Sequence, residues 1–462
     1  MMSFPEGFNW GSATASYQVE GAFDVGGRSA SIWDTFSKTP GKVVRGDNGD
    51  VACDHYNRYE EDIKIMKDLG MQSYRFSIAW PRIMPNGTGE VSQEGIDFYN
   101  RLIDALLEAG IQPTATLYHW DLPQVLQDKG GWGNRDIVQQ FADYATVCAE
   151  AFGDRVANWI TINEPWCVTW LGNFWGVHAP GLKDLDTAIA VAHHTALAHA
   201  EATRAIRAVR PESRSGITLN MTNYRVSDES NTELLQLRDY WDSNINRWWM
   251  DAQLHGTYPQ NLVDFYGDKL AKVLLPGDME RLKIDSEFLG VNYYSDSFLN
   301  TPTPEQVEKN EGTFVFPINS DGTSPGPHTD MGWPITPDGL GDLLIRIHKD
   351  WPEIIDIAIT ENGVAYDDEP DENGVVNDQR RVDYLIAHLH SVERAIAAGA
   401  PVKSYYYWSL MDNFEWAEGY AKRFGIVHIN FETLQRTPKL SAQVYSKVIQ
   451  SNGASLSALV HN

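Results

Sequence analysis

The sequence predicts an α/β fold, a single (β/α)8 TIM barrel with long loops at the C-terminal face. Three observations predict it: eight short β-prone runs, segments of helical period between them, and no linker, low-complexity tract or short repeat. Strands that alternate with helices form a parallel sheet, and eight such units close into a barrel. We therefore expect residues 1–462 to form one domain.

Each β-prone run has the length and composition of a strand. The runs cover residues 8–13, 73–78, 113–119, 159–163, 216–220, 288–293, 357–361 and 404–409. Amphipathic segments with apolar residues three and four apart predict helices over residues 56–69, 94–109, 137–152, 185–209 and 380–398. Residues 300–333 show little regular pattern and are rich in Pro, Gly, Asn and Thr, which predicts a loop over the barrel mouth.

Composition and charge exclude several classes of protein. With 63 acidic and 37 basic residues, the net charge of −26 would repel nucleic acid and anionic membranes, so we expect neither as a partner. The sequence has no apolar run long enough to span a membrane and no secretory signal, which predicts a cytoplasmic location. Cys53, Cys148 and Cys167 lack C-x-x-C spacing, and buried thiols are favoured over disulfides or a zinc cluster.

Other candidate motifs fail on their spacing. His193, His194 and His199 share one predicted helix but not the H-E-x-x-H pattern, so we interpret them as helix-surface or core residues. A G-x-S-x-G motif is missing, and Gly87-x-Gly89 has no third glycine, which argues against a serine hydrolase and a dinucleotide site. We expect no metal and no cofactor.

Polar residues end several of the predicted strands: His119, Asn163 with Glu164, Asn292, and Glu361. In a barrel of this kind the active site is built at the carboxyl ends of the strands. A single Glu at a strand end is usually a helix cap or a solvated charge. Two glutamates at the ends of different strands, both facing the mouth of one barrel, favour a functional role.

Glu164 and Glu361 follow the fourth and seventh strands, which lie on roughly opposite walls of an eight-stranded ring. Glycoside hydrolysis needs such a pair: one carboxyl protonates the leaving oxygen and the other attacks or stabilises the sugar carbon. At about 5 Å and an effective dielectric near 20, two negative charges repel by about 3 kcal/mol, or roughly 2 pK units. One glutamate should therefore stay protonated near neutral pH.

Ordered motifs along nearly the whole chain resemble those of glycoside hydrolase family 1, the β-glucosidase family. They are FNWGSATA at residues 8–15, YQVEG at 17–21, YRFSIAW at 74–80, TINEP at 161–165, ITENG at 359–363 and NFEW at 413–416. The resemblance implies that Glu164 is the general acid/base and Glu361 the nucleophile. It also places Arg75 and Tyr294 beside Glu361, although composition alone would favour a structural ion pair for Arg75 and a core position for Tyr294.

The resemblance further implies a set of sugar-binding residues, with Asn163 at the 2-hydroxyl and Gln18 and Glu415 at the outer hydroxyls. The set is Gln18, His119, Asn163, Asn292, Trp408, Glu415, Trp416 and Phe424. On the leaving-group side, which varies with substrate, it implies Trp166, His178 and Trp333. Because Glu415 would repel a phosphate, a free sugar is favoured over a phosphorylated one.

The sequence therefore predicts a catalytic domain that hydrolyses terminal β-D-glucosides, and also β-galactosides or β-fucosides, with net retention. Cellobiose, cello-oligosaccharides and aryl or alkyl glucosides are the expected small-molecule substrates. A closer alternative is transfer of the sugar to an alcohol or a second sugar, because either can attack the ester intermediate of a retaining enzyme in place of water. A non-catalytic sugar-binding barrel is a further alternative, but it gives two facing carboxylates no benefit to offset their repulsion. The sequence makes no prediction of the oligomeric state.

Overall fold

The computed structural model describes residues 4–300 and 324–459, and eight strands of this part close into a parallel barrel. The strands are β1 (Asn9–Ala13), β2 (Ser73–Ser77), β3 (Gln112–Tyr118), β4 (Asn158–Asn163), β5 (Arg214–Asn220), β7 (Phe288–Asn292), β9 (Ile357–Asn362) and β10 (Val402–Trp408). Around the ring they follow the order β1, β10, β9, β7, β5, β4, β3 and β2. The predicted barrel is confirmed, and each predicted run matches one strand with ends that differ by at most two residues.

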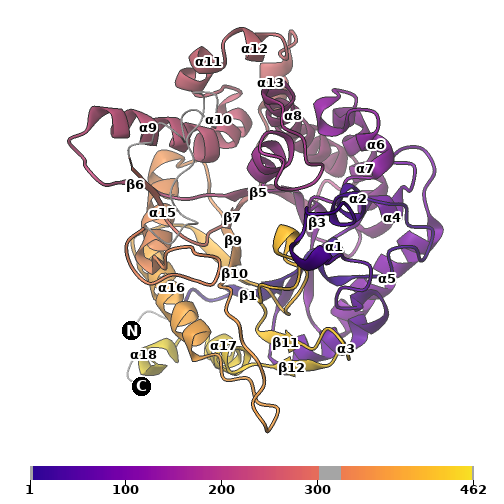
Figure 1. Cartoon of the computed structure of the whole chain (residues 1–462), viewed down its shortest axis with the longest axis vertical. Coiled ribbons are helices and arrows are strands. Elements are labelled where there is room, and N and C mark those ends of the chain that lie inside the picture. Colours follow the sequence, from indigo (N-terminus) through magenta and orange to yellow (C-terminus); the bar gives the residue numbers. More distant parts are fainter. Residues whose placement is uncertain (1–3, 301–323, 460–462) are drawn as a thin grey trace.

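Helices surround the barrel (Figure 1). The longer ones are α3 (His55–Asp68), α5 (Gln93–Glu108), α7 (Ile137–Phe152), α8 (Leu185–Val209), α9 (Thr232–Asp242), α10 (Trp248–His255), α15 (Pro337–Asp350), α16 (Gln379–Ala397) and α17 (Leu440–Gln450). The five predicted helices correspond to α3, α5, α7, α8 and α16 within one residue at each end. In α5 the buried residues Tyr99, Leu102, Ile103 and Leu106 recur at helical spacing, and Ser92 caps the amino end by accepting from Gly95 N.

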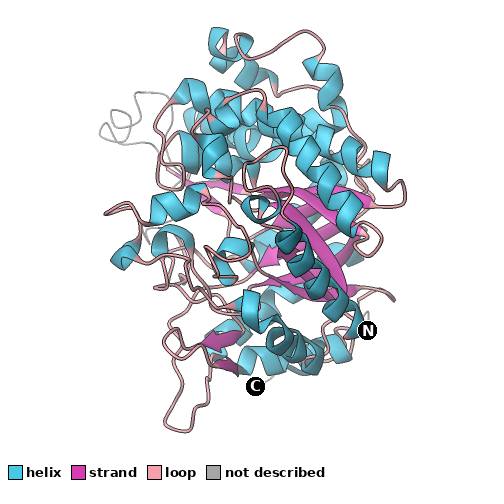
Figure 2. Cartoon of the chain, turned by 90° about the vertical axis from the view of Figure 1, so that its right-hand side faces the viewer, coloured by secondary structure: helices cyan, strands magenta, loops and turns pink. Residues whose placement is uncertain are grey.

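Shorter elements lie in the connections between the long ones. They are α1 (Ser16–Val19), α2 (Ile32–Ser37), η1 (Val44–Gly46), α4 (Trp80–Ile83), α6 (Gln124–Gln127), η2 (Gly131–Gly133), η3 (Cys167–Gly172), η4 (Ser243–Arg247), α11 (Gln260–Tyr266), α12 (Asp268–Ala271), α13 (Asp278–Leu282), η5 (Trp416–Glu418) and α18 (Leu456–Leu459). Two small sheets pair β6 (Tyr224–Val226) with β8 (Ser297–Leu299) and β11 (Val427–Ile429) with β12 (Arg436–Pro438). In the side view of Figure 2 the barrel strands lie in the middle, with helices above and below them.

The barrel strands are almost wholly buried, and β2, β7 and β9 are buried at every residue. This explains why they read as nearly continuous apolar runs, as strands of parallel sheets do. Polar side chains near their carboxyl ends are therefore exceptions that need partners. Cys53, Cys148 and Cys167 are buried and free, as predicted.

The histidines of α8 are satisfied core residues. His193 contacts the Tyr258 hydroxyl at 2.7 Å and an Asp278 carboxylate oxygen at 2.9 Å. His199 contacts the Thr161 hydroxyl at 2.7 Å. Within the described ranges, no cluster of His, Cys, Asp and Glu has an arrangement that could hold a metal ion.

Most of the predicted mouth loop, residues 301–323, lies outside the described residues. Its described end reaches the mouth of the barrel, where Met331 and Trp333 line a cavity. Among the helices of the described part, none combines the length and the apolarity needed to cross a membrane.

Candidate active site

A cavity of about 380 Å³ lies at the carboxyl ends of the barrel strands. Residues at the ends of β3, β4, β5, β7, β9 and β10 line it: His119, Glu164, Asn220, Asn292, Glu361 and Trp408. The rest of its wall includes Trp120, Trp166, Cys167, His178, Thr222, Tyr294, Ser295, Met331, Trp333, Glu415, Trp416, Glu418 and Phe424. Strand ends from six parts of the chain thus bring the two predicted glutamates into one cavity.

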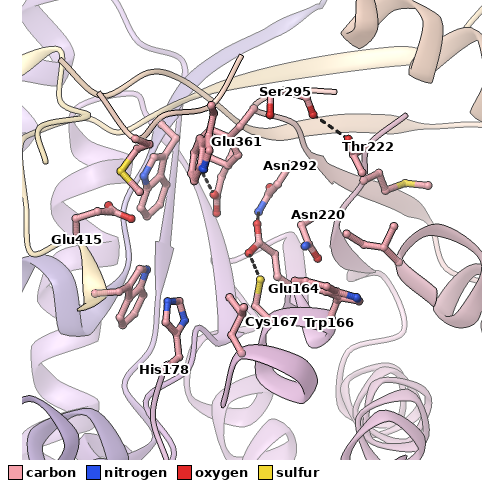
Figure 3. Close-up of a pocket in the computed structure, with 18 of the residues that line it drawn as sticks. Glu164, Trp166, Cys167, His178, Asn220, Thr222, Asn292, Ser295, Glu361 and Glu415 are labelled. Atoms are coloured by element: carbon pink, nitrogen blue, oxygen red, sulfur yellow. Dashed lines mark hydrogen bonds between the residues drawn. The ribbon is translucent and has the colours of Figure 1, made fainter. Parts of the chain in front are cut away.

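Glu164 immediately follows β4, and its backbone has a left-handed φ of 48°. Residues with a side chain adopt this region only when their surroundings hold them there. Here the Glu164 N–H donates to Thr218 O at 2.9 Å on the neighbouring strand. The side chain accepts from Asn292 Nδ2 at 2.6 Å and from Cys167 Sγ at 3.2 Å (Figure 3).

Glu361 lies inside β9 and has different partners. Its Oε1 accepts from Arg75 Nη1 at 2.6 Å, and its Oε2 accepts from the Tyr294 hydroxyl at 2.6 Å. Arg75 is completely buried, so this ion pair is shielded from water. The same guanidinium donates through Nη2 to Asn163 Oδ1 at 2.6 Å. Arg75 and Tyr294 therefore lie beside Glu361, as predicted from the resemblance.

Two amides and the Arg75 guanidinium connect the two carboxylates. Asn292 opposes Glu361 in the β7–β9 ladder, and its Nδ2 donates to Glu164 Oε1 at 2.6 Å and to Asn163 Oδ1 at 3.1 Å; Arg75 in turn bonds to both Asn163 and Glu361. Thr360 holds this amide by donating to Asn292 Oδ1 at 2.7 Å. Asn163 Nδ2 in turn contacts His119 Nε2 at 3.1 Å. The predicted residues Asn163, His119 and Asn292 thus belong to one network, in which His119 and Asn292 line the cavity.

The environments of the two carboxyls favour different protonation states. Burial, and next the negative charge of Glu361, raise the pKa of Glu164 to about 7. Burial also raises the pKa of Glu361, while the Arg75 cation and the Tyr294 hydroxyl lower it. The groups titrate as a pair, and because Arg75 bonds directly to Glu361 and acts on Glu164 only through its charge, we expect their shared proton on Glu164. This agrees with the expectation that one glutamate is protonated near neutral pH.

Five of the eight predicted sugar-binding residues lie on α1, at the end of β10 and in the segment after β10. Trp408, Glu415, Trp416 and Phe424 line the cavity, whereas Gln18 is fully buried and is not one of the lining residues. Gln18 Nε2 donates to Asn413 Oδ1 at 3.1 Å and to Phe414 O at 2.8 Å.

Three buried polar atoms in this region have no protein partner in the described structure: Gln18 Oε1, His119 Nδ1 and Glu415 Oε2. Buried polar groups are normally hydrogen-bonded, so the atoms of His119 and Glu415, which line the cavity, are available for a polar ligand. Burial lowers the pKa of His119 well below its usual value, so its imidazole is neutral. Burial and the neighbouring negative charges raise the pKa of Glu415 well above its usual range.

The three residues assigned to the leaving-group side also line the cavity. Trp166 donates to Asn244 Oδ1 at 2.7 Å, and His178 packs edge-on against Trp33 with ring centroids 5.4 Å apart. Trp333 packs against Tyr294 with centroids 5.4 Å apart. Their contact with a leaving group stays a prediction.

Sequence reasoning missed several lining residues. Asn220 ends β5 as Asn163 and Asn292 end their strands, so the same pattern could have identified it. Trp120 directly follows His119 and donates to Asn163 O at 2.9 Å. Cys167 was interpreted only as a buried thiol, and nothing in its spacing indicated contact with Glu164.

Comparison with known proteins gives a consistent result. The profile of Glycosyl hydrolase family 1 matches residues 1–454. Beta-glucosidase A of Acetivibrio thermocellus is 46% identical over 98% of this chain and 99% of its own length. A bifunctional beta-D-glucosidase/beta-D-fucosidase of Bifidobacterium breve is 42% identical over 98% and 99%. The structure of a family 1 β-glucosidase from Thermotoga maritima in complex with isofagomine lactam matches with a TM-score of 0.92 and 45% identity, covering 97% of this chain and 99% of that one.

Proposed function

The chain belongs to glycosyl hydrolase family 1, and from this premise we propose that it is a retaining β-glucosidase in which Glu164 is the acid/base and Glu361 the nucleophile. The observation that carries the assignment is the difference between the partners of the two carboxyls. Glu361 has a buried guanidinium and a phenol, both at 2.6 Å. Glu164 has an uncharged amide and a thiol. The donors around Glu361 favour the ionised carboxylate, whereas those around Glu164 allow it to remain a protonated acid.

The reaction proceeds in two displacements. Glu361 attacks the anomeric carbon of the glucosyl group while Glu164 gives its proton to the leaving glycosidic oxygen, which forms a glucosyl ester and frees the alcohol. The ester removes the charge of Glu361, and with it the repulsion on Glu164. Glu164 then takes a proton from water as that water attacks the anomeric carbon, releasing β-glucose and restoring both carboxyls. Direct attack suits a carboxyl separation of about 5 to 5.5 Å, which stays a prediction for this pair.

The proposed substrates are terminal β-D-glucosyl groups of cellobiose, cello-oligosaccharides and aryl or alkyl glucosides. We include β-D-fucosides, which the bifunctional relative supports, and β-D-galactosides. The unpartnered atoms of Gln18, His119 and Glu415 support contacts to sugar hydroxyls. Among the described residues that line the cavity there is no lysine or arginine, which supports a free sugar over a phosphorylated one.

We further propose that residues 1–462 form one catalytic domain that acts on small sugars. The cytoplasmic location stays a proposal, which the three free cysteines support because cysteines of oxidising compartments are usually paired.

Replacing the nucleophile tests the assignment. Glu361→Gly should abolish hydrolysis, and added azide should then occupy the space and attack an activated β-glucoside directly. A single displacement inverts the anomeric carbon, so the expected product is the α-glucosyl azide, identified by NMR. The unchanged enzyme with azide is the control. Recovery of the β-azide would move the nucleophile role away from Glu361.

A further inference from the structure

Cys167 lies one helical turn after Glu164, at the start of η3. Its N–H donates to Glu164 O at 2.9 Å, which fixes the turn. The same turn brings Cys167 Sγ to 3.2 Å from Glu164 Oε2. The thiol lines the cavity, and the residue is only 8% exposed (Figure 3). A cysteine side chain therefore lies against the carboxyl that the proposed mechanism uses twice.

The other oxygen of Glu164 is already occupied. Asn292 Nδ2 donates to Oε1 at 2.6 Å, and its amide is held in turn by Thr360. An oxygen that accepts a short N–H bond is a poor place for an additional proton. The acidic proton of Glu164 is therefore expected on Oε2, the oxygen that faces Cys167.

A thiol has a particular chemistry at this position. The S–H group is a weak donor and sulfur a weak acceptor, so it can donate to an ionised Oε2 without holding it strongly. A hydroxyl would donate more strongly and favour the carboxylate. An alkyl side chain would not donate at all. Burial raises the pKa of the Cys167 thiol well above its usual value, so it remains a donor throughout the working pH range.

We propose that Cys167 is a positioning residue for catalysis: its S–H holds Oε2 of Glu164 in place and tunes the readiness of that oxygen to give and take the proton. The proposal rests on the proposed acid/base role of Glu164. It predicts that the side chain at position 167 sets the upper limb of the pH profile.

Other groups also act on Glu164, and the experiment must leave them unchanged. The titratable and charged groups that face it are Glu361 from β9, Arg75 from β2, Tyr294 after β7 and Glu415 after β10. His119, after β3, is linked to the site through Asn163. None of these side chains bonds to Cys167 Sγ in the described structure, so its replacement changes one contact of Glu164.

The test is the pH dependence of kcat/KM for cellobiose, whose leaving sugar needs the acid. Its upper limb reports the acid in the free enzyme. Cys167→Ala should raise the pKa of this limb by about half a unit, because the carboxylate loses a donor, and Cys167→Ser should lower it by a similar amount. Cys148→Ala removes a buried thiol from α7, away from the cavity, and should leave the limb unchanged.

Opposite shifts for Ala and Ser support the proposal. The same upper-limb pKa in all variants, or a shift in the same direction for both Cys167 variants, would overturn the proposal, since an effect of packing would not follow donor strength. The nearly isosteric Cys167→Ser keeps the test available if the alanine variant is unstable. Glu164→Ala separates the two claims: if it leaves the upper limb in place, the acid/base assignment fails. If it removes the limb and the Cys167 variants do not move it, only the role of Cys167 fails.

Discussion

Replacing Glu361 by glutamine should lower the pKa of Glu164. The substitution removes a negative charge and nearly preserves the shape of the side chain. Glu164 keeps its own contacts with Asn292 and Cys167, so the change in its pKa reports the repulsion between the two carboxyls. In the proposed mechanism the same loss of charge occurs when Glu361 becomes a glucosyl ester, so the variant imitates the electrostatics of the intermediate.

The magnitude follows from the structure. Glu164 has a pKa of about 7, raised first by burial and second by Glu361. Two unit charges about 5 Å apart at an effective dielectric near 20 interact by about 3 kcal/mol, or roughly 2 pK units. Because burial is the larger cause and remains in the variant, we take this value as an upper bound. We expect the pKa of Glu164 to fall by about 1 to 2 units.

Carbon NMR of enzyme labelled at the glutamate carboxyl carbons measures this pKa directly. The Glu164 signal is assigned by its loss in a variant that also carries Glu164→Gln. Glu353→Gln, which changes an exposed carboxylate, is the matched control and should leave the Glu164 titration unchanged. A Glu164 pKa that stays near 7 in Glu361→Gln would refute the reasoning, because burial alone would then account for the acid.

Three further substitutions have expected outcomes. Glu164→Ala should slow alkyl glucosides by several orders of magnitude and dinitrophenyl glucosides far less, because a dinitrophenolate leaves without a proton; equal losses in kcat/KM would contradict its role as the acid. Glu415→Gln should reduce kcat/KM for glucosides by about 10- to 100-fold, the cost of leaving a buried hydrogen-bonding group of the sugar site poorly paired, and unchanged steady-state kinetics would remove Glu415 from the sugar site. Thr360→Val should lower kcat by about 10-fold, because Asn292 Oδ1 loses the donor at 2.7 Å that orients its amide, while Thr360→Ser should retain the rate; equal rates for both would show that Asn292 is held without this bond.

The strands were predictable because the barrel imposes one pattern on all of them. A run such as residues 357–361 is buried on both faces, so its apolar residues stand out, and a polar residue that ends it must face the mouth. The starts of β5 and β10 lie two residues before the predicted runs. Arg214 and Ser215 continue the ladder of β5 toward the amino end of the barrel, where polar residues are tolerated, so the apolar run began two residues late.

Contacts between segments far apart in the sequence could not be predicted from local patterns. The carboxamide of Gln18 donates to Asn413 and Phe414, almost 400 residues away, and no local pattern links these residues. The resemblance placed Gln18 in the site but gave no partners for it. Asn220 shows the opposite case: the strand end was predicted correctly, and the residue was overlooked although it fitted the pattern.

Backbone strain is a second feature that could not be predicted from the sequence pattern. Trp120, Glu164 and Trp416 all line the cavity and all have left-handed φ values, of 80°, 48° and 47°. Residues of these types favour other conformations, so propensity predicts against each of them. Such strain is retained where the surrounding fold holds a side chain in a required direction. In this structure the strained backbone directs the side chains of Glu164, Trp120 and Trp416 into the same cavity.

In the proposed mechanism, two glutamates take different roles because their hydrogen-bond partners differ. The donors around Glu361 are a cation and a phenol, and those around Glu164 are an amide and a thiol. Arg75 keeps its positive charge throughout the proposed cycle, so Glu361 returns to a stable anion each time the ester is cleaved. The second pair is uncharged, so the pKa of Glu164 depends on its neighbour and falls when Glu361 is esterified. In the proposed mechanism, the charge on Glu361 therefore switches Glu164 between the roles of acid and base.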